Sequence, residues 1–229
     1  MAAGILYVVA TPIGHLGDFS LRALEVLKNC EVLACEDSRV SSRLLTRYKL
    51  SRPLILYNAA HEIRQTAVLL KKLKLGKNVA LISDAGTPSL SDPGFRLVRA
   101  CRKDGIAVLP VPGASAALAA LSVSGLPTES FLFLGFLPPK SSARQEIFQR
   151  YEDCPHTLIF YEACHRIEKF LQEAREVLGD ARWACVAREM TKLHETYITR
   201  TLGEICEEKL CLPAKGEFTV LIAKSRFTL

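Results

Sequence analysis

The chain alternates short apolar runs with longer stretches in which apolar residues recur every three or four positions. In the first half, the apolar runs predict strands at 5–10, 32–35, 54–57, 79–82 and 106–110. The longer stretches predict helices that begin near Asp18 or Ser20, lie around Leu44, begin at Glu62 and begin at Phe95. Short strands that alternate with helices form a largely parallel sheet with helices on both faces. The first half is therefore predicted to be α/β.

The second half repeats this alternation with less regular spacing. Its apolar runs predict strands at 131–136, 157–161, 182–187 and 217–223, with helices at about 142–152, 166–178 and 202–208. The segment 188–202 is open to an added antiparallel strand around Tyr197, which would make this sheet mixed. A helix of small residues at 116–124 lies near the junction of the halves. We place the two domains at 1–112 and 113–229.

One connection, Ser83–Gly94, is longer than the roughly 2–6 residues usual between a strand and a helix. Asp92 before Pro93 predicts a helix N-cap followed by proline at the first helical position. Open α/β sheets bind ligands where strands end and helices begin, because free N–H groups converge there. The connection is therefore a candidate ligand loop, with an ordinary strand-to-helix turn as the alternative.

Composition narrows the protein class without identifying it. A chain of 229 residues with a formal charge of +6 permits a nucleic-acid partner but does not require one. None of the eight cysteines forms a C-x-x-C pair, so we expect reduced core thiols in a cytoplasmic protein and no metal site. The N-terminus lacks the basic region of a signal peptide, and no run is long enough to span a membrane.

Ten short motifs occur in an order that is familiar. They are Thr11–Gly14, Glu36–Arg39, Ser83–Pro88, Asp92–Gly94, Val111–Ser115, Gly135–Pro138, Phe160–Glu162, His165-Arg166, Arg188–Lys192 and Gly216–Phe218. On these motifs the chain resembles the bacterial ribosomal small-subunit RNA methyltransferase I family, within the tetrapyrrole methylase-like superfamily. The resemblance runs from Leu6 to about Ile222. It departs at Ala163-Cys164, where family members often have Ser-Pro.

The resemblance implies the fold, the cofactor and the reaction. It implies two α/β domains of the tetrapyrrole methylase type with the cofactor cleft between them, and a homodimer. The reaction it implies is 2′-O-methylation of a cytidine in the decoding region of 16S ribosomal RNA, with S-adenosyl-L-methionine as methyl donor. Loops after strands suit a cofactor that needs backbone groups and a carboxylate acceptor. The candidate cofactor residues are Thr11, Pro12, Ile13, Gly14, Asp84, Ala85, Gly86, Thr87, Pro88, Ser115, Ala116, Tyr161 and Glu217.

Methyl transfer to a hydroxyl also needs a proton acceptor. Charged residues at the ends of different strands are the candidates, namely Glu36, Asp37, Glu62, Glu162, His165 and Arg188. Among them we favour Glu62, because a helix N-terminus orients it. The alternative is that Arg39–Glu36 and Arg188–Glu189 are solvated or structural ion pairs, and that His165 is a satisfied loop histidine.

Candidate RNA contacts come from basic residues. A spacing of i, i+4 and i+8 would put Arg39, Arg43 and Arg47 on one face of a helix, where they could contact RNA phosphates. The alternative is that this face is only solvated. Lys140, Arg144, Arg166 and Lys192 complete the candidate set. The sequence shows no aromatic stacking platform of the kind that single-strand binders use.

Two other functions stay open at this point. A corrin-type tetrapyrrole methylase of the same superfamily would need a deep apolar bowl and no basic helix face. A non-enzymatic phosphate- or nucleotide-binding module would use the Ser83–Gly94 loop without methyl transfer.

Overall fold

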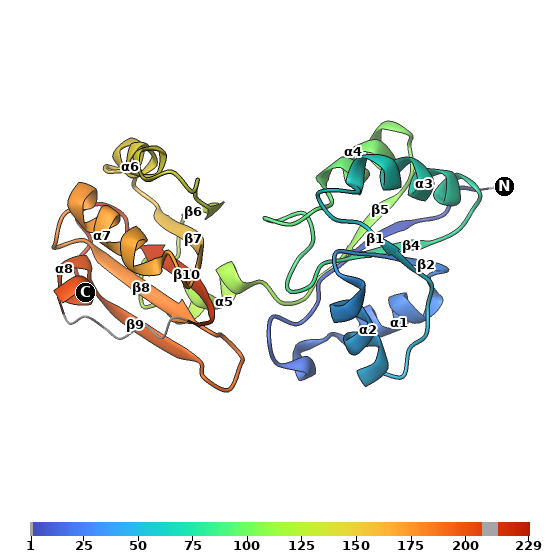
Figure 1. Ribbon diagram of the computed structural model, residues 1–229, viewed down its shortest axis with the longest axis horizontal. Coiled ribbons are helices and arrows are strands. Elements are labelled where there is room, and N and C mark those ends of the chain that lie inside the picture. The colour runs from blue at the N-terminus through green and yellow to red at the C-terminus, as the bar shows by residue number, and fades with distance from the viewer. Residues whose placement is uncertain (1, 208–214) are drawn as a thin grey trace. The chain divides into compact units, whose positions relative to one another are not determined.

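The computed structural model describes residues 2–207 and 215–229, in two compact units, Met1–Ser115 and Ala116–Leu229 (Figure 1). The division falls after Ser115, whereas the sequence pattern placed the domain boundary after Pro112. The limits of the two domains stay a prediction, as does a cofactor cleft between them.

The N-terminal unit is built on a parallel sheet. Its strands are β1 (Leu6–Val9), β2 (Val32–Cys35), β3 (Leu54–Leu56), β4 (Val79–Ile82) and β5 (Val108–Val111), in the order β3-β2-β4-β1-β5. Every pairing in this sheet is parallel. The connections carry the 3₁₀ turn η1 (Leu16–Asp18) and the helices α1 (Leu21–Asn29), α2 (Ser38–Arg47), α3 (Glu62–Lys74) and α4 (Phe95–Lys103). The parallel α/β prediction is confirmed.

Alternate side chains of the central strand β4 show why helices cover both faces of this sheet. Val79 and Leu81 are buried in one core cluster with residues of α3 and α4. Ala80 and Ile82 are buried in another cluster with residues of α1 and α2. Figure 1 shows α3 and α4 on one side of the sheet and α1 and α2 on the other. A strand buried on both faces has to be apolar throughout, as β4 is.

The C-terminal unit has a mixed sheet. Its strands are β6 (Phe131–Phe136), β7 (Thr157–Ala163), β8 (Trp183–Arg188), β9 (Thr196–Thr201) and β10 (Glu217–Ile222), in the order β6-β7-β10-β8-β9. The β6–β7 pair is parallel and the other neighbours are antiparallel. The additional strand around Tyr197 is β9, so the mixed sheet is confirmed. The helices are α5 (Ala116–Val123), α6 (Ser141–Arg150), α7 (Ile167–Leu178) and α8 (Leu202–Glu207).

The core of the C-terminal unit lies between the sheet and α6, α7 and α8. Phe148, Phe160 and Phe170 are fully buried and meet edge to face, with ring centroids 5.2–5.9 Å apart. Such aromatic contacts add to the gain from apolar burial. α5 packs separately against β7 and β10.

The N-cap predicted at Asp92 is wrong. α4 begins at Phe95 with Gly94 as its N-cap, at φ = +148°. A side chain at Gly94 would come within 2.2 Å of Ser89 Oγ, so the turn requires glycine both for its dihedral angle and for its close packing. Asp92 is instead hydrogen-bonded to the side chain of Ser83.

The cysteines of the described residues are free thiols. Burial raises the pKa of Cys30 to about 12 and that of Cys101 to about 11, which suppresses thiolate chemistry. Cys211 and the predicted helix end at Glu208 lie outside the described residues. In the part of the chain that is described, no helix is both long and apolar enough to cross a membrane.

Candidate functional site

Two loops of the N-terminal unit join where their parallel strands end. The Thr11 N–H donates to the Gly86 carbonyl at 2.9 Å, and the Gly86 N–H donates back to the Thr11 carbonyl at 3.1 Å. The Thr11 hydroxyl also donates to the Ser83 carbonyl at 3.1 Å. The loop after β1 and the loop after β4 therefore form one continuous backbone surface.

The loop after β5 joins the same surface. The Thr87 hydroxyl donates to the Ala114 carbonyl at 3.2 Å. Ile13 and Ala114 both lie within 4 Å of the position that a side chain at Gly86 would take. These contacts join Thr11, Ile13, Gly86 and Thr87. The other cofactor residues predicted in this unit lie on the same three loops, namely Pro12, Gly14, Asp84, Ala85, Pro88 and Ser115.

Three carboxyl groups lie close together beside this surface, and we call Glu36, Asp84 and Asp92 the acid cluster. Burial raises the pKa of Glu36, and the charges of Asp92 and Asp84 raise it further. Burial also raises the pKa of Asp84. The pKa of Asp92 rises to about 6, because burial and the Asp84 charge outweigh its hydrogen bond with Ser83. Such a cluster favours a bound cation, since positive charge would relieve the repulsion.

Asp37, the next residue after Glu36, has the opposite electrostatics. Its carboxylate accepts hydrogen bonds from the Arg39 side chain and from the Arg39 N–H, which hold its pKa at about 2. The Asp37 N–H donates to Asp84 Oδ1 at 3.0 Å, so the residue ties the loop after β2 to the acid cluster. Asp37 caps α2 and orients its neighbours, and its carboxylate is already paired.

Glu62 lies at the first position of α3, as predicted. Its Oε1 accepts a hydrogen bond from Arg96 Nε of α4 at 2.7 Å. One of its oxygens is therefore engaged in an ion pair between two helices.

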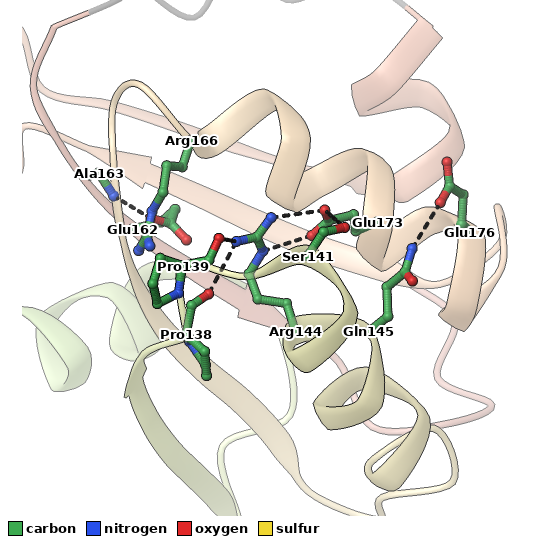
Figure 2. A network of polar contacts seen from close by, with 10 residues as sticks. All are labelled: Pro138, Pro139, Ser141, Arg144, Gln145, Glu162, Ala163, Arg166, Glu173 and Glu176. Atoms are coloured by element: carbon green, nitrogen blue, oxygen red, sulfur yellow. Dashed lines mark hydrogen bonds and ion pairs between the residues drawn. The ribbon is translucent and has the colours of Figure 1, made fainter.

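The buried Glu162 and the partly exposed Arg166 form an ion pair at the end of β7 (Figure 2). Glu162 Oε1 accepts from Arg166 at 2.7 Å and from the Ala163 N–H at 2.7 Å. Glu162 Oε2 is buried without a hydrogen-bond partner among the described residues. The pair fixes the turn from β7 to α7, and His165 in that turn is exposed.

Arg188, Lys192 and Glu217 belong to a second network in the same unit. Arg188 donates to the carbonyls of Lys215 at 3.1 Å and His194 at 3.3 Å. The Lys192 ammonium lies 2.9 Å from Glu189 Oε1 and 2.8 Å from Glu217 Oε2. These contacts tie the loop after β8 to the start of β10. Roles in catalysis, RNA contact and cofactor binding stay predictions for these three residues.

Arg144 is a correction to the predicted RNA contacts. Its side chain is 2% exposed, and Nε and Nη2 donate to the two carboxylate oxygens of Glu173 at 2.7 and 2.8 Å (Figure 2). Nη1 donates to the carbonyls of Pro138 and Pro139 at 3.1 and 2.7 Å. A guanidinium with these partners cannot reach a phosphate, so the RNA role predicted for Arg144 is wrong.

The exposed basic residues agree better with their predicted placement. Arg39, Arg43 and Arg47 all lie on α2 and are exposed, although Arg39 is paired with Asp37 at 2.6 Å. Lys140 is exposed at the N-cap of α6. RNA contact by these residues stays a prediction.

Tyr161 and Ala116 lie together in the C-terminal unit. The Tyr161 hydroxyl accepts a hydrogen bond from the Ala117 N–H in the first turn of α5, which begins at Ala116.

Across the described residues, no group of three or more His, Cys, Asp or Glu side chains is placed to hold a metal ion.

Comparison with known proteins defines the class. The model of the tetrapyrrole (corrin/porphyrin) methylases matches residues 5–206. The methyltransferase CobJ has a similar structure, with a TM-score of 0.74 at 16% identity over 99% of this chain and 97% of that chain. Uroporphyrin-III C-methyl transferase from Thermus thermophilus, solved in complex with S-adenyl homocysteine, has a TM-score of 0.65 at 19% identity, covering 95% and 96% of the two chains. The fold is that of the tetrapyrrole methylases.

A relative with much higher identity narrows the class. The ribosomal RNA small subunit methyltransferase I of Haemophilus influenzae is 47% identical over 221 residues, which are 96% of this chain and 78% of that protein. This chain belongs to the ribosomal RNA small subunit methyltransferase I family. The resemblance found in the sequence is confirmed.

The buried Arg144–Glu173 pair gives a stability prediction. Arg144→Met leaves the Glu173 carboxylate buried without its cation, so the free energy of unfolding should fall by about 3–5 kcal/mol. The double variant Arg144→Met/Glu173→Leu removes both charges and should be clearly more stable than the single variant. Urea unfolding followed by the fluorescence of Trp183, the single tryptophan and part of β8, measures both. A single variant that unfolds like the parent would contradict the structural role of Arg144.

The acid cluster predicts that removing a charge stabilises the protein, and that this gain depends on pH. Because the folded-state pKa of Asp92 is raised from 3.8 to about 6, its neutral form stabilises the protein at low pH, and this contribution is lost as pH rises through 6. Asp92→Asn should therefore be more stable than the parent at pH 8, by about 1–3 kcal/mol. The difference should vanish near pH 4. Urea unfolding followed by circular dichroism at both pH values measures it.

Asp37→Asn is the matched control. Its folded-state pKa is lowered to about 2, so its charged form stabilises the protein above pH 3.8 and loses that effect as pH falls towards 2. This variant should be less stable than the parent at pH 8. Equal responses of the two variants to pH would show that the acid cluster lacks the electrostatics described.

Proposed function

We propose that this protein transfers a methyl group from S-adenosyl-L-methionine to the 2′-hydroxyl of a cytidine in 16S ribosomal RNA of the small subunit. The observation that carries the proposal is the joined strand-end surface with the acid cluster beside it, in a chain of this family. The name of the Haemophilus influenzae relative supports ribosomal RNA as the substrate class. We further propose that the protein works in the cytoplasm and forms a homodimer. Light scattering at micromolar concentration tests the homodimer.

The residues present fit the proposed cofactor. S-adenosyl-L-methionine is a sulfonium cation with an adenine ring, ribose hydroxyls and an amino-acid tail. The joined loops, at 11–14 and 84–88, offer backbone groups for the ring, and Asp84 and Asp92 of the acid cluster offer acceptors for hydroxyl and ammonium groups. The same carboxylates stabilise positive charge. When bound, the cofactor supplies an activated methyl group.

The part left to the chain is positioning and proton transfer. In-line displacement depends on alignment, and good positioning contributes about 7–11 kcal/mol to lowering a barrier. The proton acceptor works best when its pKa is raised towards the working pH. Glu36 meets this condition, because burial and its acidic neighbours raise its pKa. Glu62, favoured from the sequence, already accepts a hydrogen bond from Arg96. We therefore propose Glu36 as the acceptor.

Methyl transfer from labelled cofactor tests the function. The substrate is small ribosomal subunits from a strain that lacks the native enzyme, and the product is mapped by nuclease digestion. Label on a cytidine ribose of 16S ribosomal RNA is the expected result. Transfer to a corrin-type tetrapyrrole instead would favour the alternative methylase function, and an absence of cofactor binding in calorimetry would favour the non-enzymatic module.

Two isosteric variants test the proton acceptor. Glu36→Gln should keep RNA affinity and lower turnover at least 10²-fold, roughly the lower bound for loss of a general base. Glu62→Gln should lower turnover by less than about tenfold, since its role is structural. Single-turnover rates at saturating cofactor measure both. The reverse ranking would restore Glu62 as the acceptor.

A double charge reversal on α2 tests the RNA face. Arg43→Glu/Arg47→Glu should weaken binding to the subunit and flatten the dependence of affinity on salt, because fewer phosphates are neutralised. Cofactor affinity should stay unchanged. Arg64→Glu/Lys71→Glu on α3 is the control, since it makes the same charge change at two exposed positions. Equal salt slopes for the two double variants would identify the α2 face as ordinary surface.

A further inference from the structure

A β-bulge in the edge strand β6 rearranges its aromatic residues. Phe133 is in register with Ile159 of β7, but Gly135 is in register with Phe160, so Leu134 is an extra residue. Gly135 has φ = +63°, the left-handed conformation that glycine adopts readily in such bulges. Residues three apart normally lie on opposite faces of a strand. The bulge instead puts Phe133 and Phe136 on the same face.

Both rings pack against Tyr161. The Phe133 and Tyr161 centroids lie 5.0 Å apart, the Phe136 and Tyr161 centroids 5.6 Å apart, and both contacts are edge to face. Tyr161 is itself held by the hydrogen bond from the Ala117 N–H. Phe136 is nevertheless 56% exposed, so its ring is supported on one side and open to solvent.

The segment after Phe136 is fixed at its other end. Arg144 donates to the consecutive carbonyls of Pro138 and Pro139, while its fork is held by Glu173 (Figure 2). Burial opposes ionisation of Glu173, but hydrogen bonds from Arg144 and Ser141 lower its pKa, so the pair stays charged. The segment ends at the exposed Lys140. The aromatic ring of Phe136 and the ammonium group of Lys140 thus lie at the two ends of a turn that Arg144 holds in place.

This combination matches the chemistry of an unpaired nucleotide. Bases of single-stranded RNA stack on exposed aromatic rings, and the adjoining phosphates are neutralised by lysine and arginine. An apolar partner protein would not need the lysine, and a free anion would not need the ring. The occupant that uses both features is a base with its phosphate.

We propose that Phe136 stacks on a base of the substrate RNA strand and that Lys140 contacts a phosphate of the same strand. The proposal rests on the proposed function, because it assigns the RNA contact of that reaction. It also revises the expectation from the sequence that no aromatic platform is present. Phe136 is thus assigned a role in substrate binding, with Arg144 and Glu173 as positioning residues.

The experiment compares Phe136→Leu with Phe131→Leu. Phe131 is a matched control, because it lies on the same strand and is 42% exposed. Phe136→Leu should raise the KM for small subunits by about 5- to 150-fold, the affinity range of one base–aromatic stack, with kcat and cofactor affinity unchanged. The slope of affinity against salt should also stay unchanged, since no charge is removed. Lys140→Gln should instead reduce that slope by about one phosphate contact.

A fluorescence measurement separates the RNA base from the adenine of the cofactor. In a Trp183→Phe background, Phe136→Trp places a single tryptophan at the platform. Small subunits should quench its emission, and cofactor alone should not. Quenching by cofactor alone would overturn the proposal.

Failure of the platform is distinguishable from failure of the function. If the parent enzyme methylates small subunits while Phe136→Leu and Phe131→Leu share its KM, the platform is overturned and the function stands. If the parent enzyme transfers no methyl group to RNA, the proposed function fails first. Retained KM in Phe136→Trp confirms that the leucine variant lost stacking and did not merely misfold.

Discussion

Parallel pairing in the N-terminal sheet is the constraint on which the candidate site depends. Because β1, β2, β4 and β5 run in the same direction, the loops that follow them emerge at the same edge. The reciprocal hydrogen bonds between Thr11 and Gly86 then lock two of these loops together. The acid cluster also follows from this arrangement, since Glu36 follows β2 and Asp84 follows its neighbour β4. Antiparallel pairing would have put these residues at opposite edges.

Much of the fold was predictable, because burial on both faces of the first sheet leaves a clear sequence signal. The continuous apolar runs at 32–35 and 79–82 coincide with β2 and β4. The helix cap at Asp92 was not predictable in the same way. Its side chain is hydrogen-bonded to Ser83, and the helix instead begins after Gly94, where the dihedral angle and the packing leave no room for a side chain.

In the candidate site too, features set by local spacing were predictable and features set by distant contacts were not. Spacing placed Arg43 and Arg47 on an exposed helix face, because helical periodicity alone decides that. Spacing could not reveal that Arg144 is buried, since its partner Glu173 lies 29 positions away. The aromatic platform was missed for a related reason. A bulge of one residue changes which side chains share a face of the strand. The regular two-residue alternation of side chains along a strand does not predict where such a bulge occurs.

With the cofactor bound at the acid cluster as proposed, the cluster would link the folding equilibrium of this chain to its ligand. Burial raises the pKa of all three carboxyl groups, and the charge of Asp84 raises those of Glu36 and Asp92 further, which is a local cost that the folded protein bears while the cluster lacks a counter-charge. A cationic ligand removes part of that cost, and any ligand that binds the folded state alone stabilises it in proportion to the logarithm of its concentration. The unliganded chain is then the form more exposed to proteases and aggregation. The abundance of the protein in a growing cell would in this way follow the supply of its methyl donor.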